Sequence, residues 1–217
     1  LSIFHPSRSE IFVYTLFSSK MFKKFDRKDV STSTQVKTSV QRHLKSQILE
    51  KHVNVTEEEV DALLPKKNPL VQYKVGAYTL VYCRRTEYEE KSPKDEPLLY
   101  QDRDGPIMPT LKCVHRYPTL DFARVTVDKG AIPFLLGGAN VMCPGLTNPG
   151  GEMPPDTDEG PGLKKGAGVV IYAQGKEYAL GVGLMTMSSA EVRSKNKGNA
   201  IQLLHFLGDG LYEVNEI

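Results

Sequence analysis

The fold of this chain is decided by residues 125–146, which read V-T-V-D-K-G-A-I-P-F-L-L-G-G-A-N-V-M-C-P-G-L. Val125 and Val127 alternate with polar residues, as the side chains of a half-buried strand do. Asp128 follows at once, and its carboxylate can accept the unpaired N–H groups at the start of a helix. The stretch therefore predicts a strand that leads directly into a short helix.

The expected helix has one apolar face and ends at a glycine pair. Its apolar face consists of Ile132, Leu135 and Leu136. Gly137-Gly138 ends it, because glycine adopts positive φ without a steric penalty. Residues 141–143 fit a buried strand that ends at the turn Pro144-Gly145. Glycines near one Lys and one Asn suit the holding of a phosphate-rich or flipped-out nucleic-acid segment better than they suit catalysis.

Composition describes a soluble globular protein of one domain or two. The chain has 217 residues, of which 40% are hydrophobic and 25% charged. No apolar run approaches the roughly 20 residues that span a bilayer, so we expect no membrane contact. Residues 21–120 hold 18 Lys and Arg against 14 Asp and Glu, whereas residues 121–217 hold 8 against 11. The first half therefore carries a mild basic bias, which is compatible with RNA.

The cysteines give no sign of a metal or disulfide framework. Cys83, Cys113 and Cys143 lie far apart, and no CxxC pair occurs. We expect reduced, buried thiols, no metal site and no cofactor.

The first half reads as mixed α and β structure. We expect residues 1–20 to be an extension outside the fold, with an organelle-targeting leader as the alternative. Helices are predicted over 35–52 and from Thr56, where Thr56 and Glu59 form a capping box, to Pro65.

Strands and loops complete the predicted first domain, 21–120. The alternation predicts strands over 71–75, 78–83 and 98–101. Residues 84–97 are charged and hold two prolines, which predicts a loop. Pro109 is expected to open a short helix that Pro118 closes.

The predicted second domain, 121–217, is a small barrel-like β domain. After a Pro/Gly/acid loop over 147–168, a hairpin joins 169–173 to 178–185. Ser188 and Glu191 form another capping box, for a helix that Gly198 ends. A second hairpin is expected around Asp209-Gly210.

Several motifs in this order resemble a known family. V-D-K-G-A (127–131), G-A-N (138–140), C-P-G-L (143–146) and H-F-L-G-D-G-L-Y (205–212) are similar to a PUA domain. M-F-K-K-F (21–25), L-P-K-K-N-P (64–69), G-P-I-M-P-T-L (105–111) and H-R-Y-P (115–118) narrow the resemblance to the malignant T-cell-amplified sequence family of translation factors. The chain departs from that family at 1–20, 84–97 and 150–166. It departs also at Pro133, which we expect to interrupt the helix.

The resemblance implies an α+β fold, with a mixed N-terminal domain followed by a PUA pseudo-β-barrel. It also implies a non-catalytic cytoplasmic factor that binds small-ribosomal-subunit RNA and the tRNA acceptor end, with a density-regulated-protein homologue as its partner. Such a factor acts in reinitiation, in unusual initiation and in release of deacylated tRNA. We expect a monomer or a heterodimer.

Two groups of residues are predicted to contact RNA. The first lies in the PUA domain and comprises Lys129, Gly130, Ala131, Gly138, Ala139, Asn140, Lys195 and Lys197. The second lies in the N-terminal domain, where it faces RNA or a partner, and comprises Arg42, Lys45, Lys66, Lys67, Lys112 and Arg116. Lysines neutralise phosphate, glycines allow a close approach, and the Asn amide both donates and accepts.

Two other classes of function compete with a translation factor. An RNA-modifying enzyme needs a positioned nucleophile or base, but the scattered histidines show no obvious Ser, Cys or Asp partner in the sequence. A protein adaptor or accessory factor in RNA modification or ribosome assembly needs only an apolar and basic surface. Binding of the partner-free protein to small subunits would separate the adaptor from the factor.

Overall fold

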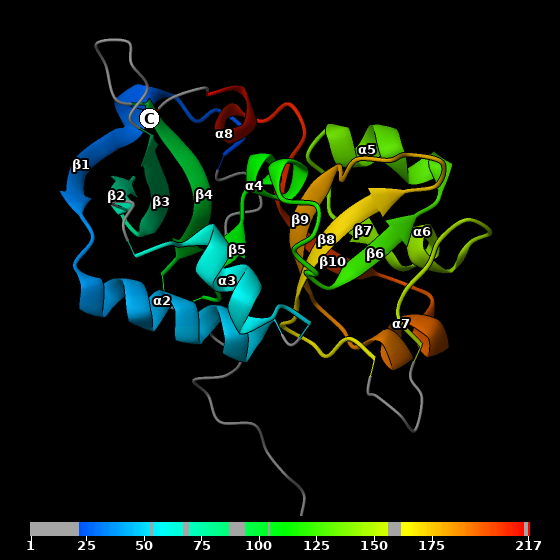
Figure 1. Ribbon diagram of the computed structural model, residues 1–217. Helices are drawn as coiled ribbons and strands as arrows, with labels where there is room; N and C mark the ends of the chain where they lie inside the picture. Colours follow the sequence, from blue (N-terminus) through cyan, green and yellow to red (C-terminus); the bar gives the residue numbers. More distant parts are fainter. Residues whose placement is uncertain are drawn as a thin grey trace, which may run out of the picture.

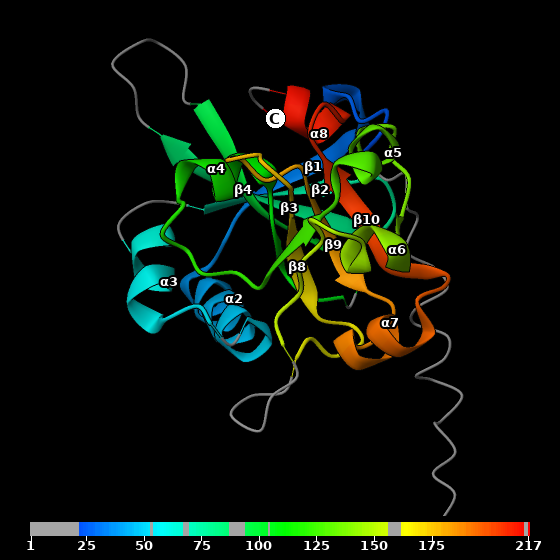
Figure 2. The ribbon, with the colours of Figure 1, turned by 90° about the vertical axis from the view of Figure 1, so that its right-hand side faces the viewer.

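The computed structural model describes residues 22–52, 54–66, 70–86, 94–103, 105–155, 162–214 and 217. The predicted extension 1–20, Lys67 and residues 87–93 of the predicted loop lie outside these ranges. Within them the chain forms two five-stranded sheets that lie side by side (Figures 1 and 2).

The first sheet has the strand order β1-β2-β3-β4-β5, and all neighbouring strands are antiparallel. Its strands are β1 (Val30–Gln35), β2 (Leu70–Val75), β3 (Thr79–Thr86), β4 (Lys94–Asp102) and β5 (Met108–Pro109). The helical elements of this half are η1 (Arg27–Asp29), α2 (Thr38–Lys51), α3 (Glu57–Leu63) and α4 (Leu111–Arg116). In Figure 1, α2 and α3 lie together along one side of the sheet.

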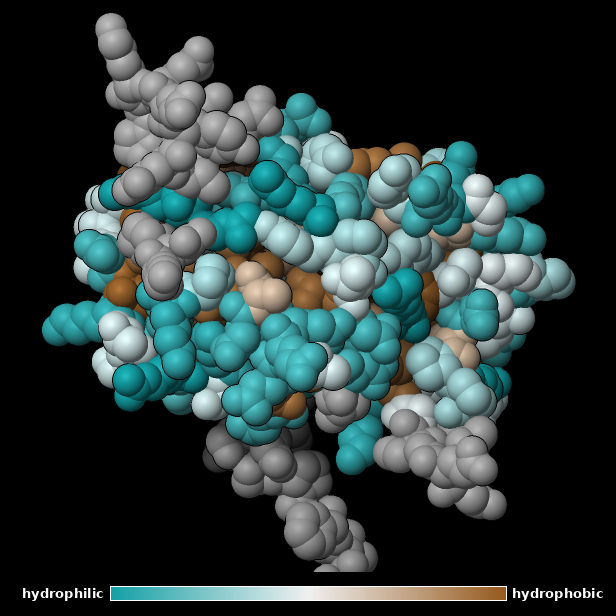
Figure 3. Space-filling model, in the orientation of Figure 1, coloured by the Kyte–Doolittle hydropathy of each residue, from teal (hydrophilic) through white to brown (hydrophobic). Residues whose placement is uncertain are grey.

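The two helices predicted over 35–52 and from Thr56 to Pro65 are confirmed as α2 and α3. The Thr56 side chain accepts the N–H of Glu59, and the Glu59 side chain accepts the N–H of Thr56, so the capping box forms as expected. In α2, Leu44 and Ile48 are buried, but Val40 in the first turn is 38% exposed. The outer face of this helix is hydrophilic (Figure 3).

One strand and the ends of two others were not predicted, because their residues are mostly polar or charged and do not alternate with buried apolar side chains. β1 was not predicted: its residues V-S-T-S-T-Q are almost all exposed, and backbone pairing with β2 holds the strand. β3 and β4 extend into the predicted loop 84–97, where Arg84 pairs with Glu96 at 3.1 Å. Charged cross-strand pairs there replace the apolar alternation that the prediction required.

The second sheet has the order β6-β8-β9-β10-β7, in which only β6 and β8 are parallel. Its strands are β6 (Arg124–Val127), β7 (Val141–Met142), β8 (Gly168–Ala173), β9 (Gly181–Met185) and β10 (Asn199–Phe206). The helical elements are η2 (Lys129–Ala131), α5 (Ile132–Leu136), α6 (Cys143–Thr147), α7 (Ser189–Lys195) and α8 (Gly210–Glu213). The predicted α+β class, the β8–β9 hairpin and the Ser188 capping box are thus confirmed.

Three predicted turns or helix starts are wrong. Asp209-Gly210 does not join two strands: the Asp209 carboxylate accepts the N–H of Tyr212 and caps α8. Pro144-Gly145 does not form a turn but the second and third residues of α6. Pro109 belongs to β5, and Thr110 caps α4 instead. An Asp-Gly pair serves a hairpin turn and a helix N-cap equally well, so the dipeptide alone does not distinguish them.

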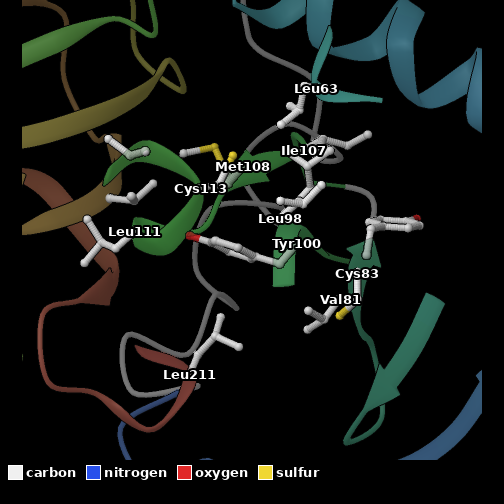
Figure 4. Close-up of a cluster of buried hydrophobic side chains, with 14 of the residues drawn as sticks. Leu63, Val81, Cys83, Leu98, Tyr100, Ile107, Met108, Leu111, Cys113 and Leu211 are labelled. Carbon is white, nitrogen blue, oxygen red and sulfur yellow. The ribbon is translucent and has the colours of Figure 1, made fainter. Parts of the chain in front are cut away.

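A continuous hydrophobic core joins the two halves. Tyr100, Met108 and Leu111 of the first half lie in one cluster with Leu211 of the second (Figure 4). A Cβ built on Gly168 of β8 would lie 2.7 Å from the Met108 sulfur, so the two sheets approach as closely as glycine allows. Because this core takes side chains from both halves, the division into domains 21–120 and 121–217 stays a prediction.

Candidate nucleic-acid interface

The two most specific motifs of the sequence, V-D-K-G-A and C-P-G-L, pack against each other. The N–H of Asp128 donates to the carbonyl of Gly145 at 2.8 Å. The amide of Asn148 donates to the Asp128 carboxylate at 2.7 Å, and the N–H of Ala131 donates to it at 2.8 Å. Helix α6 therefore fixes η2, where Lys129 and Gly130 are exposed.

Helix α5 follows η2 without interruption. Pro133 lies in its first turn, where backbone N–H groups have no intrahelical acceptor. The proline therefore removes no helical hydrogen bond, and the expected interruption is wrong. Leu135 faces inward at 1% exposure, as predicted. Leu136 is 40% exposed and does not belong to the inward face. The neighbouring Phe134 is 69% exposed, and sequence reasoning gave it no role.

Gly138 ends α5 as predicted, but it also meets a close neighbour. Its φ is +83°, and a Cβ there would lie 3.1 Å from the Phe206 ring. The ammonium of Lys23 donates to the carbonyl of Gly137 at 2.8 Å. A lysine from the first residues of the described chain thus lies at the end of this PUA-like helix. Sequence reasoning missed Lys23 because no local pattern links it to α5.

Asn140 has a structural role that the prediction did not include. Its carbonyl oxygen accepts the N–H of Leu203 in β10 at 3.0 Å. The Asn140 oxygen, which was predicted to accept a hydrogen bond from RNA, is therefore bonded to the sheet. The Nδ2 group of Asn140 is the donor that remains for a ligand.

Lys195 and Lys197 lie apart from the other six residues predicted in this half. Lys195 is the last residue of α7 and Lys197 follows this helix, and α6 lies between α7 and α5 in both views (Figures 1 and 2). Lys195 is 2.8 Å from Glu191, and this hydrogen bond lowers the pKa of Glu191 to about 2. Both lysines are exposed. Because they lie beyond α6, the structure brings together only the six predicted residues that flank α5.

The predicted basic residues of the first half fall into two clusters. Lys45 and Lys66 lie near Asp61, where mainly the ion pair with Lys45 lowers the pKa of that carboxyl. Arg42 precedes Lys45 by one turn of α2 and is exposed. We call Arg42, Lys45 and Lys66 the α2–α3 patch. Lys67 lies outside the described residues.

The second cluster is on α4 and is engaged within the protein. Lys112 is half-buried and its ammonium donates to the carbonyl of Val214, while burial lowers its pKa. Arg116 lies 2.6 Å from Glu96. Both cations are bonded to other residues of the protein, whereas Arg42 and Lys66 of the α2–α3 patch are exposed, so these two are the better candidates for RNA contact.

An open groove of about 560 Å³ runs along β6. Its lining includes Arg124, Lys176, Asp121, Glu152 and Tyr172, and it contains none of the predicted RNA-contacting residues. Both signs of charge meet there, which does not favour a polyanion.

The described part of the chain shows neither a metal-binding cluster nor a membrane-spanning helix. It holds no cluster of three or more His, Cys, Asp or Glu side chains that would suit a metal ion. Its helices include none of the length and apolarity that crossing a membrane requires.

Two family models match this chain in sequence order. One, described as "Pre-PUA-like domain", matches residues 24–118, and the other, described as "elF2D, PUA domain", matches residues 123–210. The second half is thus a PUA domain, as its motifs predict.

Solved archaeal structures share the fold. A protein of Pyrococcus horikoshii superposes with a TM-score of 0.64 at 22% identity, covering 85% of this chain and 99% of that one. A conserved PUA domain protein of Thermoplasma acidophilum superposes with a TM-score of 0.54 at 19% identity, covering 85% and 99%.

Curated relatives match over nearly their whole length. Translation machinery-associated protein 20 of Saccharomyces cerevisiae is 42% identical over 88% of this chain and 97% of that protein. Malignant T-cell-amplified sequence 2 of Homo sapiens is 40% identical over 89% of this chain and 98% of that protein. The chain therefore belongs to the family of malignant T-cell-amplified sequence proteins and translation machinery-associated protein 20.

Proposed function

We propose that the protein is a non-catalytic, cytoplasmic RNA-binding translation factor that acts on the small ribosomal subunit and tRNA. One observation carries the proposal: full-length relatives named for the translation machinery align with a chain whose second half is a PUA domain. Within that function it acts in reinitiation, in unusual initiation and in release of deacylated tRNA. A density-regulated-protein homologue is its partner.

The proposed RNA contact lies around α5 of the PUA domain. Lys129, Gly130 and Ala131 precede this helix, and Gly138, Ala139 and Asn140 follow it. The acceptor end of a tRNA is single-stranded, and proteins recognise such ends through exposed backbone, cations and stacking. Lys195 and Lys197 would meet RNA only if it extends past α6.

Charge reversal at Lys129 tests this placement. Lys129 is exposed, so Lys129→Glu leaves the fold intact while it removes one phosphate contact. We expect the affinity for tRNA-loaded small subunits to fall about tenfold, or ~1.4 kcal/mol. The slope of log affinity against log salt should also fall by about one contact. Equilibrium titration of purified subunits at several salt concentrations measures both.

The matched control is Lys74→Glu, which makes the same charge change at an exposed position of β2. Equal losses for the two variants would mean that overall charge, not a site around α5, governs binding. Asn140→Asp is a second probe, since it retains the acceptor for Leu203 while it removes the donor.

The adaptor alternative makes a different prediction for the same titration. A pure adaptor would show no affinity for small subunits until its protein partner is added. Partner-free binding that depends on Lys129 therefore favours the translation factor.

A further inference from the structure

Exposed apolar side chains cluster at α5. Among the described residues six large apolar side chains are exposed, and two of them, Phe134 and Leu136, belong to the five residues of α5. Hydrophobic surface is visible at the upper edge of the molecule beside α5 (Figure 3). Single exposed apolar residues are ordinary, but a cluster marks a binding surface.

The backbone that carries Phe134 is held firmly. Its carbonyl accepts the N–H of Ala139 at 2.9 Å, and the carbonyl of Pro133 accepts the N–H of Gly137 at 3.0 Å. Leu135, the next residue, is anchored in the core. An aromatic ring that is 69% exposed is thus presented from a fixed support, which lowers the entropic cost of ordering a ligand on it.

Lys23 also lies at this surface, and the turn that carries it is anchored by buried residues on both sides. Phe22 and Phe25 are buried, and the N–H of Gly210 donates to the carbonyl of Phe22 at 2.8 Å. A Cβ on Gly210 would lie 2.3 Å from the Phe25 oxygen, so this turn and α8 are in direct contact. Lys23 lies between the two anchors, and its ammonium reaches the C-terminal end of α5.

A lysine therefore lies at each end of the helix that exposes Phe134. Lys129 lies at the start of η2, and Lys23 binds Gly137 at the end of α5. Lysine is depleted at the centres of protein–protein interfaces, whereas cations beside an exposed aromatic ring are the usual design of single-strand nucleic-acid sites. Charge and apolar surface together favour a nucleotide over a protein segment.

We propose that Phe134 stacks on an unpaired base of bound RNA and that Lys23 neutralises a phosphate next to that base. The inference rests on the proposed RNA-binding function and gives the same surface a nucleotide subsite. This subsite is composite: its ring comes from the PUA domain and its cation from the turn that begins the described chain. Double-stranded RNA offers no free base face, so the subsite selects a single-stranded end.

Fluorescence of a base analogue tests the stacking. The ligand is an acceptor-stem minihelix with 2-aminopurine at its unpaired 3′ end, and a blunt minihelix of the same stem is its control. We expect the full-length protein to quench the analogue, and Phe134→Ala to abolish quenching and weaken binding about tenfold. Phe134→Tyr should restore both, whereas Phe134→Leu, which keeps apolar surface without a ring, should behave as Ala does. Binding of the blunt minihelix should not change.

Matched variants separate the subsite from the proposed function. Tyr78→Ala removes an aromatic ring of similar exposure on the other domain and should leave affinity and quenching unchanged. Lys23→Met should reduce the salt dependence of binding, and Lys23→Arg should retain it. Wild-type affinity and quenching in Phe134→Ala, with a loss for Lys129→Glu, would overturn the subsite and leave the proposed function standing. No binding of either minihelix by the wild type would overturn both.

Discussion

Gly138 shows how tightly the fold constrains a residue that was predicted to serve a ligand. The left-handed backbone at this position and the Phe206 ring 3.1 Å from a built Cβ each disfavour a side chain. The glycine is therefore favoured by the protein's own packing, whether or not RNA approaches it. Asn140 is constrained in the same way, since its oxygen accepts an N–H of β10.

Gly138→Ala should destabilise the protein by about 2 kcal/mol, from the left-handed backbone and the contact with Phe206 together. Gly76→Ala is the control, because Gly76 has a φ of +57° but nothing within 4 Å of a built Cβ. It should cost about 1 kcal/mol, from the backbone alone. Urea unfolding of both variants measures the difference. Equal losses would show that Phe206 moves aside without cost.

At the scale of elements, helices with local end signals were predictable and the outer strands were not. The capping boxes at Thr56 and Ser188 located α3 and α7, because the signal and its partner lie three residues apart. β1 carries no apolar alternation, and its partner β2 is distant in sequence. Pairing of that kind depends on topology, which no short window of sequence contains.

For the candidate site, too, the sequence could group only residues that lie close together in the chain. Lys129 and Gly138 were grouped in the predicted site because they flank the same short helix. Lys195 and Lys197 were grouped with them by residue type, but α6 separates them in space. Lys23 was missed because the contact with Gly137 joins residues 114 positions apart in the chain.

The α2–α3 patch gives a prediction at this scale. We expect Arg42→Glu and Lys66→Glu each to weaken binding to small-subunit RNA several-fold and to lower its salt dependence, because both side chains are exposed cations. Lys51→Glu, at the opposite end of α2 and paired with Glu50, is the control. Salt-dependent titration with isolated subunit RNA measures the effect. Unchanged salt slopes for Arg42→Glu and Lys66→Glu would assign the patch to another role.

At the scale of the whole molecule, histidines lie where the two halves meet. His115 contacts the carbonyl of Ala179 at 2.9 Å, and His205 packs edge-on against Phe22 and Tyr100. His52 is 3% exposed, bonds the carbonyl of Ile107 at 2.7 Å and packs against Phe122. Burial lowers the pKa of His52 below its usual value of 6.5.

The stability of the folded protein should therefore decrease in mild acid. Below about pH 6.5 the unfolded chain binds a proton that buried His52 does not, so the free energy of unfolding falls as pH falls. Above that pH both states are neutral at His52 and the contribution is constant. Between pH 7 and 5.5 we expect a loss of up to about 1 kcal/mol from this residue.

Urea unfolding at both pH values measures the loss. His52→Gln keeps a donor for Ile107 and removes the titration, so its stability should depend less on pH than the wild type's. His43→Gln, on the exposed face of α2, is the control and should retain the full dependence. If His52→Gln and the wild type lose the same stability, His52 is not the group responsible.

The contact between the turn at Phe22 and Gly210 has a consequence for synthesis. Lys23 is translated long before Gly210, at about 5–20 residues per second. The first domain can begin to fold while the rest of the chain is still being made, but the turn that carries Lys23 has no α8 to hold it. The composite nucleotide subsite is therefore completed only after Gly210 has been made, and a nascent chain that has not yet reached Gly210 lacks it.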